Sequence, residues 1–146
     1  MLFMEEMLVQ NETLSTTEQN LLAYFETHDV KYVTEDAKFR NLSTGEVHTG
    51  RAEIGAMLHF IYHVAFDAKA EVRNYFFTEE KAVLEGFFKG RHIGEIAGMP
   101  ATNKEVHVPF SVAYDLENGL IKEARIYMLF SVMMEQLGLA QSPQNT

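Results

Sequence analysis

The chain contains no cysteine and carries few basic side chains. The absence of cysteine excludes disulfide bonds, thiol catalysis and cysteine-ligated metal sites. Its 12 lysines and arginines stand against 21 aspartates and glutamates, a formal net charge of -9. No short window is rich in Lys or Arg, and an acidic protein repels phosphate backbones and anionic membrane surfaces. We therefore expect neither a nucleic acid nor a membrane as a partner.

Membrane spans, export signals and cofactor signatures are also missing. Glu5 and Glu6 lie where a signal peptide would be basic, and no apolar run is long enough to cross a bilayer. There is no nucleophile elbow, phosphate-binding loop or zinc signature. The glycine-rich stretch 90–106 leads into a strand and not into a helix, so it lacks the helix N-terminus that holds phosphate. We expect a soluble, cytoplasmic protein that uses no cofactor and no metal.

The chain does have the composition of one globular domain. Hydrophobic residues make up 47% and charged residues 23% of its 146 residues, which supports a sizeable core but not two domains. We therefore expect a single domain over residues 1–146. Its core is expected at about residues 18–140, and we expect the N-terminal tail and the polar C-terminal stretch 140–146 to fray.

Apolar residues first recur at helical spacing just after a cluster of hydroxyl side chains. Ser15, Thr16 or Thr17 can cap this segment, and a break near residues 27–29 divides it into two helices. Asp36 follows the second helix. We expect its carboxylate to cap or end that helix, with a place at the mouth of a pocket as the alternative.

A short hairpin and the clearest amphipathic helix follow. Two strands around a turn at Gly45 are predicted within residues 37–50. From Arg51 the spacing becomes helical again, with Thr49 or Gly50 as the cap. One narrow face of this helix is apolar and is formed by Ile54, Met57, Leu58, Ile61 and Ala65.

Two histidines on the same helix have a spacing that suits a metal ion. His59, His63 and Asp67 recur at helical intervals. Both histidines lie opposite the apolar face, however, and no third ligand is fixed by the pattern. We interpret this group as a solvated helix face.

Strand-like segments with short turns between them occupy residues 68–130. Such short connections require antiparallel neighbours. Helices followed by a meander of strands are typical of the α+β class, with the helices covering one face of the sheet. A short final helix is predicted within residues 131–139. The strands are expected at residues 68–77, 81–97, 104–116 and 120–130.

Strand alternation places His92 at the end of an inward row that contains two glycines. The row is formed by Ala82, Leu84, Gly86, Phe88, Gly90 and His92. An imidazole titrates near neutral pH and can act as a general acid or base. The alternative interpretation is a hydrogen-bonded histidine at the end of a strand.

The last strand has no cleanly apolar face. Strict alternation groups Ile121, Glu123, Arg125, Tyr127 and Leu129 on one face, and Lys122, Ala124, Ile126 and Met128 on the other. A buried Arg125 would need a carboxylate such as Glu123, since an unpaired buried charge is costly. The alternative is a cross-strand ion pair on the surface.

Three segments together resemble the SnoaL-like polyketide cyclase family of the NTF2-like superfamily. They are "HTGRAEI" at the start of the long helix, "GRHIGEIAGMPATNKEV" at the central hairpin and "NGLIKEARIYMLFSVMMEQLG" at the end. The similarity covers about residues 18–140. It implies an α+β cone, in which a curved antiparallel sheet wraps around N-terminal helices and a long central helix. It also implies a hydrophobic pocket, a homodimer formed through sheet faces, and no cofactor.

Cyclases that this chain resembles close a ring by an intramolecular aldol reaction, with an acidic residue of the last strand as general base. That position falls on Leu129. Leucine cannot accept a proton, so the mechanism does not carry over unchanged. Asp36 or Glu123 would have to replace the missing carboxylate.

The resemblance also implies a catalytic set and a pocket lining. His92 matches the histidine of the family's G-x-H-x-G pattern and would be the base, while Tyr127 or Arg125 would stabilise a developing enolate oxygen. The ligand-binding residues implied are Phe88, Phe110, Leu129, Met57 and Ile61.

Three functions are compatible with these observations. The first is cofactor-free acid/base catalysis on a small apolar carbonyl compound, of the cyclase, isomerase or dehydratase type. The second is binding of a small hydrophobic molecule without turnover, which Leu129 favours. The third is a dimeric scaffold in which an outer row with Val83 and Phe87 matters more than a ligand, and it predicts no cavity.

Overall fold

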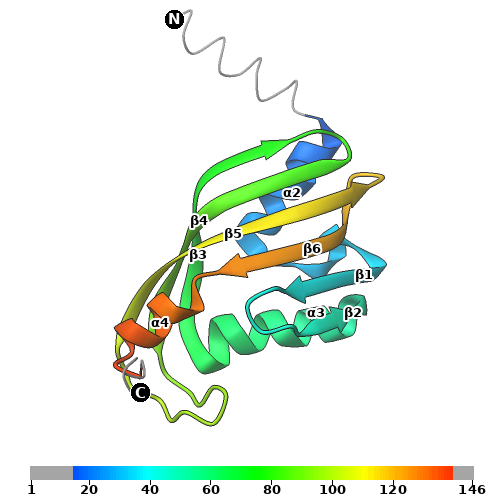
Figure 1. Cartoon of the computed structure of the whole chain (residues 1–146). Coiled ribbons are helices and arrows are strands. Elements are labelled where there is room, and N and C mark those ends of the chain that lie inside the picture. Colours follow the sequence, from blue (N-terminus) through cyan, green and yellow to red (C-terminus); the bar gives the residue numbers. More distant parts are fainter. Residues whose placement is uncertain (1–14, 140–146) are drawn as a thin grey trace, which may run out of the picture.

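The computed structural model describes residues 15–139, which form a curved six-stranded sheet and the helices that lie against it (Figure 1). This is the predicted α+β class. The predicted fraying of the two tails concerns residues 1–14 and 140–146, which lie outside the described residues. Within them, no helix combines the length and the apolar composition that a membrane crossing requires.

Helix α2 (Thr16–Thr27) begins as its sequence predicts. Ser15 is the N-cap, and its hydroxyl oxygen accepts the backbone N–H of Glu18 at 3.0 Å. The helix ends where His28 adopts a left-handed backbone conformation, with φ 55° and ψ 32°. The predicted break at residues 27–29 is therefore confirmed.

The second helix expected after this break is only a single 3₁₀ turn, η1 (Val30–Tyr32). Asp29 caps this turn by accepting the backbone N–H of Lys31 at 2.9 Å. Strand β1 (Val33–Asn41) starts at once, because β-branched residues there favour extended backbone. Asp36 consequently lies in a strand, and its predicted role as a helix cap is wrong.

Helix α3 (Gly50–His59) forms where the amphipathic pattern predicts it, and it continues as a π-helical segment, η2 (Phe60–Ala65). The Glu53 carboxylate accepts the backbone N–H of Thr49 at 2.9 Å, which satisfies one donor at the helix start. Ile54 and Leu58 are buried, as the apolar face of this helix predicts.

The sheet has the strand order β2-β1-β6-β5-β4-β3. β1 and β6 are parallel, and every other neighbouring pair is antiparallel. All four predicted strands form, but β4 ends at His92 and not at residue 97, and β6 ends at Met128 and not at residue 130. The remaining strands are β2 (Val47–Thr49), β3 (Phe66–Phe77), β4 (Lys81–His92), β5 (Glu105–Glu117) and β6 (Leu120–Met128).

Glycines allow β3 and β4 to approach closely, so that the sheet can bend. A Cβ atom at Gly86 would lie 2.2 Å from the backbone oxygen of Glu71. At Gly90 it would lie 2.3 Å from the backbone oxygen of Asp67. No other residue type fits such contacts. Figure 1 shows the result, with the sheet curling over α2 behind it and α3 at its lower end.

A bulge in β6 explains why its sequence has no cleanly apolar face. Asp115 pairs with Glu123, but Leu116 pairs with Ile121, so Lys122 is an extra residue in β6. The bulge brings Ile121 onto the same face as the apolar residues that follow it. The inner face is formed by Ile121, Ala124, Ile126 and Met128.

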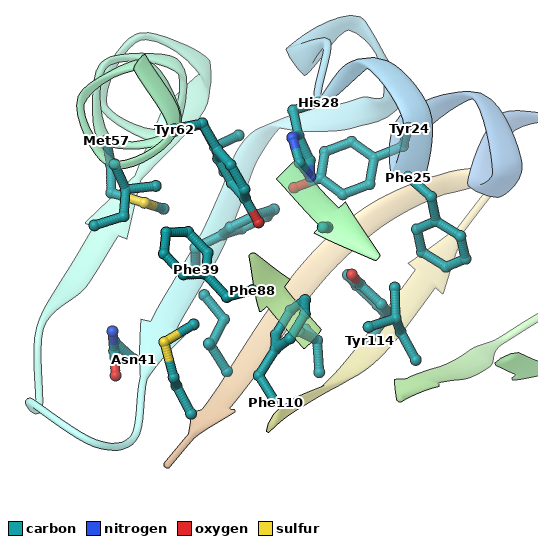
Figure 2. Close-up of a pocket in the computed structure, with 17 residues that line it drawn as sticks. Tyr24, Phe25, His28, Phe39, Asn41, Met57, Tyr62, Phe88, Phe110 and Tyr114 are labelled. Atoms are coloured by element: carbon teal, nitrogen blue, oxygen red, sulfur yellow. The ribbon is translucent and has the colours of Figure 1, made fainter. Parts of the chain in front are cut away.

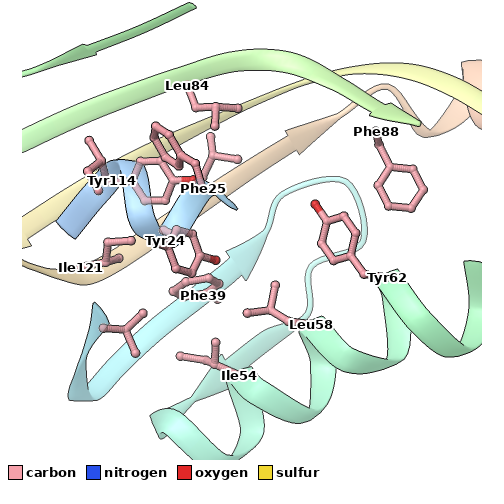
Figure 3. Close-up of a cluster of buried hydrophobic side chains, with 14 of the residues drawn as sticks. Tyr24, Phe25, Phe39, Ile54, Leu58, Tyr62, Leu84, Phe88, Tyr114 and Ile121 are labelled. Atoms are coloured by element: carbon pink, nitrogen blue, oxygen red, sulfur yellow. The ribbon is translucent and has the colours of Figure 1, made fainter. Parts of the chain in front are cut away.

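The helices cover the concave face of the sheet with aromatic side chains (Figure 3). The Tyr24 ring lies edge-on to Phe39 at 6.3 Å between centroids, and Phe25 lies edge-on to Tyr75 at 5.9 Å. A final helix, α4 (Phe130–Gln136), lies beside β5. These contacts join the helices to the strands in one core.

We predict opposite effects for alanine at two glycines. Gly86→Ala should lower the free energy of unfolding by ~2 kcal/mol or more, because the new methyl group meets backbone of β3. Gly55→Ala should raise it by up to ~1 kcal/mol, since Gly55 is inside α3 and a Cβ there lies 3.5 Å from Val30. Urea denaturation measures both. A Gly86→Ala protein as stable as the parent would contradict the close approach of β3 and β4.

Candidate functional site

A cavity of about 80 Å³ lies between the concave face of the sheet and the helices (Figure 2). Most of its lining is aliphatic or aromatic, and no Asp, Glu, Lys or Arg side chain contributes to it. Pockets for drug-sized ligands are typically ~300–1,000 Å³, so this cavity suits a compact molecule. Its polar lining residues are Tyr24, His28, Asn41, Tyr62 and Tyr114.

Three tyrosines from different elements meet around this space. Tyr24 comes from α2, Tyr62 from η2 and Tyr114 from β5, and none is more than 8% exposed. Within residues 15–139, no hydrogen bond involves any of their hydroxyl groups. Figure 3 shows the hydroxyls of Tyr24 and Tyr62 pointing into the space between the sheet and α3. These hydroxyls are available to a ligand.

Burial sets the protonation state of these phenols. Desolvation raises the pKa of Tyr24, Tyr62 and Tyr114 well above its usual value, because the charged phenolate loses its hydration. All three therefore remain protonated at neutral pH. Each offers an O–H donor inside an apolar cavity.

His28 adds an imidazole to the same cavity. Its ring stacks on Tyr62 at 4.3 Å between centroids and lies edge-on to Tyr24 at 5.4 Å. Burial, and secondarily the nearby charge of His63, lowers the pKa of His28 to about 4. The imidazole is therefore neutral at neutral pH, with a lone pair that can accept a proton.

Four residues of the implied pocket lining do border this cavity: Phe88, Phe110, Met57 and Ile61. Leu129 does not. It is 52% exposed, because β6 ends at Met128 and the chain turns there into α4. Its side chain lies outside the cavity.

His92 points inward, as strand alternation predicts, and is fully buried. Its Nδ1 accepts the backbone N–H of Thr102 at 3.2 Å and lies 3.0 Å from the Thr102 hydroxyl oxygen. The ring lies 5.1 Å from that of Phe66, and Nε2 has no hydrogen-bond partner among the residues described. His92 does not line the cavity; it holds the loop after β4 against the strand end.

Arg125 and Tyr127 lie on the opposite face of β6 from the cavity. The Arg125 guanidinium donates to both carboxylate oxygens of Asp115, at 3.1 and 3.2 Å. This is the surface cross-strand ion pair that the sequence left as an alternative. Tyr127 is 48% exposed. The expectation that both residues share a pocket with His92 is corrected, because the bulge at Lys122 leaves the other row facing inward.

The carboxylates considered as substitute bases are also outside the cavity. Asp36 is exposed on β1 and accepts the Thr34 hydroxyl at 3.0 Å. Glu123 accepts the Arg40 Nε–H at 2.9 Å. Neither reaches the cavity lining.

No metal site is evident within residues 15–139, where no group of three or more potential ligands comes together. His59 and His63 are neighbours, with 5.4 Å between ring centroids, and both are exposed. They are a pair without a third ligand.

The polar residues of the cavity were not singled out from the sequence. Tyr114 alternates with Phe110 and Val112 in its strand, so a polar-tipped aromatic residue in an apolar row was an available signal. His28 lies in the predicted break after the first helix, and nothing local indicates that its side chain turns inward. Tyr24 and Tyr62 become site residues only through the packing of α2 and η2 on the sheet.

The fold is that of the NTF2-like and ketosteroid isomerase-like proteins. A SnoaL-like protein from Jannaschia sp. CCS1 has a TM-score of 0.76 at 17% identity, over 87% of this chain and 94% of that one. A protein with a ketosteroid isomerase-like fold from Catenulispora acidiphila DSM 44928 has a TM-score of 0.69 at 14% identity, over 87% and 95%.

A family model matches most of the chain as well. The model of the SnoaL-like polyketide cyclases matches residues 17–137. The chain therefore belongs to the SnoaL-like polyketide cyclase family. A search of the curated proteins gave no match.

The lowered pKa of His28 predicts a pH-dependent stability. An unfolded histidine titrates near pH 6.5, whereas folded His28 titrates at about 4. The free energy of unfolding should therefore have its full value above pH 6.5. It should fall by up to ~3 kcal/mol as the pH drops towards 4, because the unfolded chain then binds a proton that folded His28 does not. His28→Asn, which does not titrate, should show a shallower slope in this window. Urea denaturation between pH 4.5 and 7.5 tests this, and equal slopes would contradict it.

Proposed function

We propose that this protein binds a small, neutral, largely apolar carbonyl compound in its cavity and performs cofactor-free acid/base chemistry on it. One observation carries the proposal: three protonated tyrosine hydroxyls border an apolar cavity without hydrogen-bond partners among the described residues. Their natural ligand is an acceptor such as a carbonyl oxygen.

The arrangement suits charge that develops on that oxygen. Donors held in place inside a water-poor cavity stabilise an enolate oxygen more strongly than water does, since they need no reorganisation. Tyr24, Tyr62 and Tyr114 are fixed by their places in α2, η2 and β5. They therefore take the role that the sequence comparison assigned to Tyr127 or Arg125.

The lining also favours an uncharged ligand. An ion in this cavity would lose its hydration and find no Lys, Arg, Asp or Glu side chain to pair with. A neutral molecule with one polar end avoids this cost. Met57, Ile61 and Met128 offer adaptable apolar contacts to the remainder of such a molecule.

Binding without turnover is the second candidate function. The observation in its favour is that no carboxylate lines the cavity and that Leu129, at the position of the family's base, lies outside it. Turnover of any carbonyl compound would decide against this candidate.

We predict that Tyr114→Phe separates ligand binding from stability. The variant should bind 2-indanone, a compact apolar ketone, ~2–10-fold more weakly because one hydrogen bond is lost. Its free energy of unfolding should stay the same or rise by up to ~1 kcal/mol, because a buried hydroxyl without a protein partner is removed. NMR titration and urea denaturation measure the two effects.

Tyr32→Phe is the matched control, since Tyr32 lies in η1 and does not line the cavity. It should leave the affinity for 2-indanone unchanged. If Tyr114→Phe bound the ketone as tightly as the parent protein, the proposed role of this hydroxyl would be wrong.

We also propose that two copies of the chain associate through the outer face of the sheet. Apolar side chains are exposed there: Phe76 by 63%, Val83 by 37% and Tyr127 by 48%. Phe76 pairs across strands with Val83, and Val83 with Ala113, so part of this surface is continuous. Such a patch supports a protein interface.

The association predicts a dimer in sedimentation analysis. Val83→Glu should weaken the dimer by at least ~10-fold, because it puts a charge into an apolar contact. Val64→Glu is the control, since Val64 is 44% exposed in η2, on the helical side of the sheet and away from this patch. A monomeric parent protein at high concentration would refute the dimer.

A further inference from the structure

His28 occupies a left-handed backbone position that most often carries glycine. It follows the last residue of α2 in the left-handed conformation, and its N–H donates to the Tyr24 carbonyl oxygen at 2.7 Å. Glycine is the usual residue at this position, because a Cβ atom makes the left-handed conformation unfavourable. The chain uses glycine at several left-handed positions, such as Gly45 and Gly119, and other residue types at Ala97, Asn103 and Asn118. The left-handed backbone of His28 directs its side chain towards Tyr24 and Tyr62.

Packing fixes the His28 ring but leaves its nitrogens free. Tyr62 stacks on one face of the ring and Tyr24 contacts it edge-on. Neither ring nitrogen has a hydrogen bond to any residue from 15 to 139. The ring borders the cavity near these two tyrosines, as Figure 2 shows. It is oriented by its neighbours and open to a ligand.

His28 is also the one lining side chain that can accept a proton at neutral pH. The tyrosines remain protonated, an Asn41 amide is not basic, and every other lining side chain is a hydrocarbon or a thioether. We infer that His28 is the proton acceptor of this site, in place of a carboxylate, which β6 does not bring to the cavity. This inference rests on the proposed function.

The step balances without any further reactant. A C–H bond next to the ligand's carbonyl group breaks, and its electron pair forms the C=C bond of an enolate. The proton moves to a free nitrogen of His28, while tyrosine hydroxyls donate hydrogen bonds to the enolate oxygen. The imidazolium then returns the proton to the same or to another carbon. The face of the Tyr62 ring, stacked on His28, stabilises the transient cation.

The surroundings of His28 determine when it can act. The titratable groups that face it are Tyr24 from α2, and Tyr62 and His63 from η2. Burial and the His63 charge lower the pKa of His28 to about 4, so the accepting form persists through mildly acidic conditions. An acid limb should therefore appear near pH 4, well below that of an ordinary histidine.

The experiment measures exchange of the α-hydrogens of 2-indanone for deuterium by NMR in D₂O. The parent protein should accelerate exchange. His28→Asn, which tolerates the left-handed backbone but cannot accept a proton, should lose about 100-fold or more of that acceleration. Its affinity for 2-indanone should stay within about 3-fold of the parent's, since the tyrosine donors remain. His59→Asn, on the exposed face of α3, is the control and should exchange as the parent does.

His28→Gly provides a second variant with a distinct readout. Glycine suits the left-handed conformation, and loss of the ring leaves space beside Tyr62. Added imidazole should restore part of the exchange to this variant and none to the parent. A purely structural role for His28 predicts no such rescue.

The outcomes separate the two claims. If 2-indanone binds and exchange is as fast in His28→Asn as in the parent, the inference is wrong while the proposed function stands. If it binds and the parent does not accelerate exchange, both the base and the catalytic part of the proposed function are wrong. If it does not bind, the proposed function and the inference fall together.

Discussion

The close approach of β3 and β4 is the constraint on which the rest of the structure depends. At Gly86 and Gly90 the backbones come so near that no side chain fits between them. This lets the sheet curl, and the curl creates a concave face that α2 and α3 can cover without filling it. In a flat sheet the same helices would pack directly on the strands. The glycines of this region therefore allow the sheet to curve, and the curvature leaves room for the cavity.

The cavity is maintained at a cost in stability. Tyr24, Tyr62 and Tyr114 are buried residues whose hydroxyl groups have no hydrogen-bond partner among the described residues, so these polar groups lose hydration without gaining a protein hydrogen bond. A left-handed histidine adds backbone strain. Packing offsets these costs through the buried aromatic contacts of the core. Features that weaken a fold and gather around one cavity are typical of a site kept for function.

Much of the fold could be predicted from the sequence, because the spacing of apolar residues and the capping residues of helices are local signals. The cap at Ser15 and the start of α3 at Gly50 lie where the patterns place them. The faces of β6 could not be predicted, since one extra residue at Lys122 reverses the alternation and only strand pairing reveals it. Arg125 was assigned to the pocket through the family resemblance, and alternation alone could not correct that assignment.

The candidate site was less predictable than the fold. Phe88 and Phe110 were expected at the pocket and border it, because strand alternation determines their side. His28 depends on the backbone conformation that ends α2 and on a stacking partner 34 positions away, Tyr62. Neither of these is encoded in a local pattern. His92 matched a family motif, yet its hydrogen bonds to Thr102 hold a loop.

The central claim is that tyrosine hydroxyls in this cavity hold a carbonyl oxygen. The most direct measurement is the infrared stretching frequency of the carbonyl group of ¹³C-labelled 2-indanone bound to the protein. The account predicts a frequency clearly below that of the ketone in hexane, because hydrogen bonds weaken the C=O bond. It predicts a partial return to the hexane value in Tyr62→Phe. A bound ketone with the frequency seen in hexane would contradict the account.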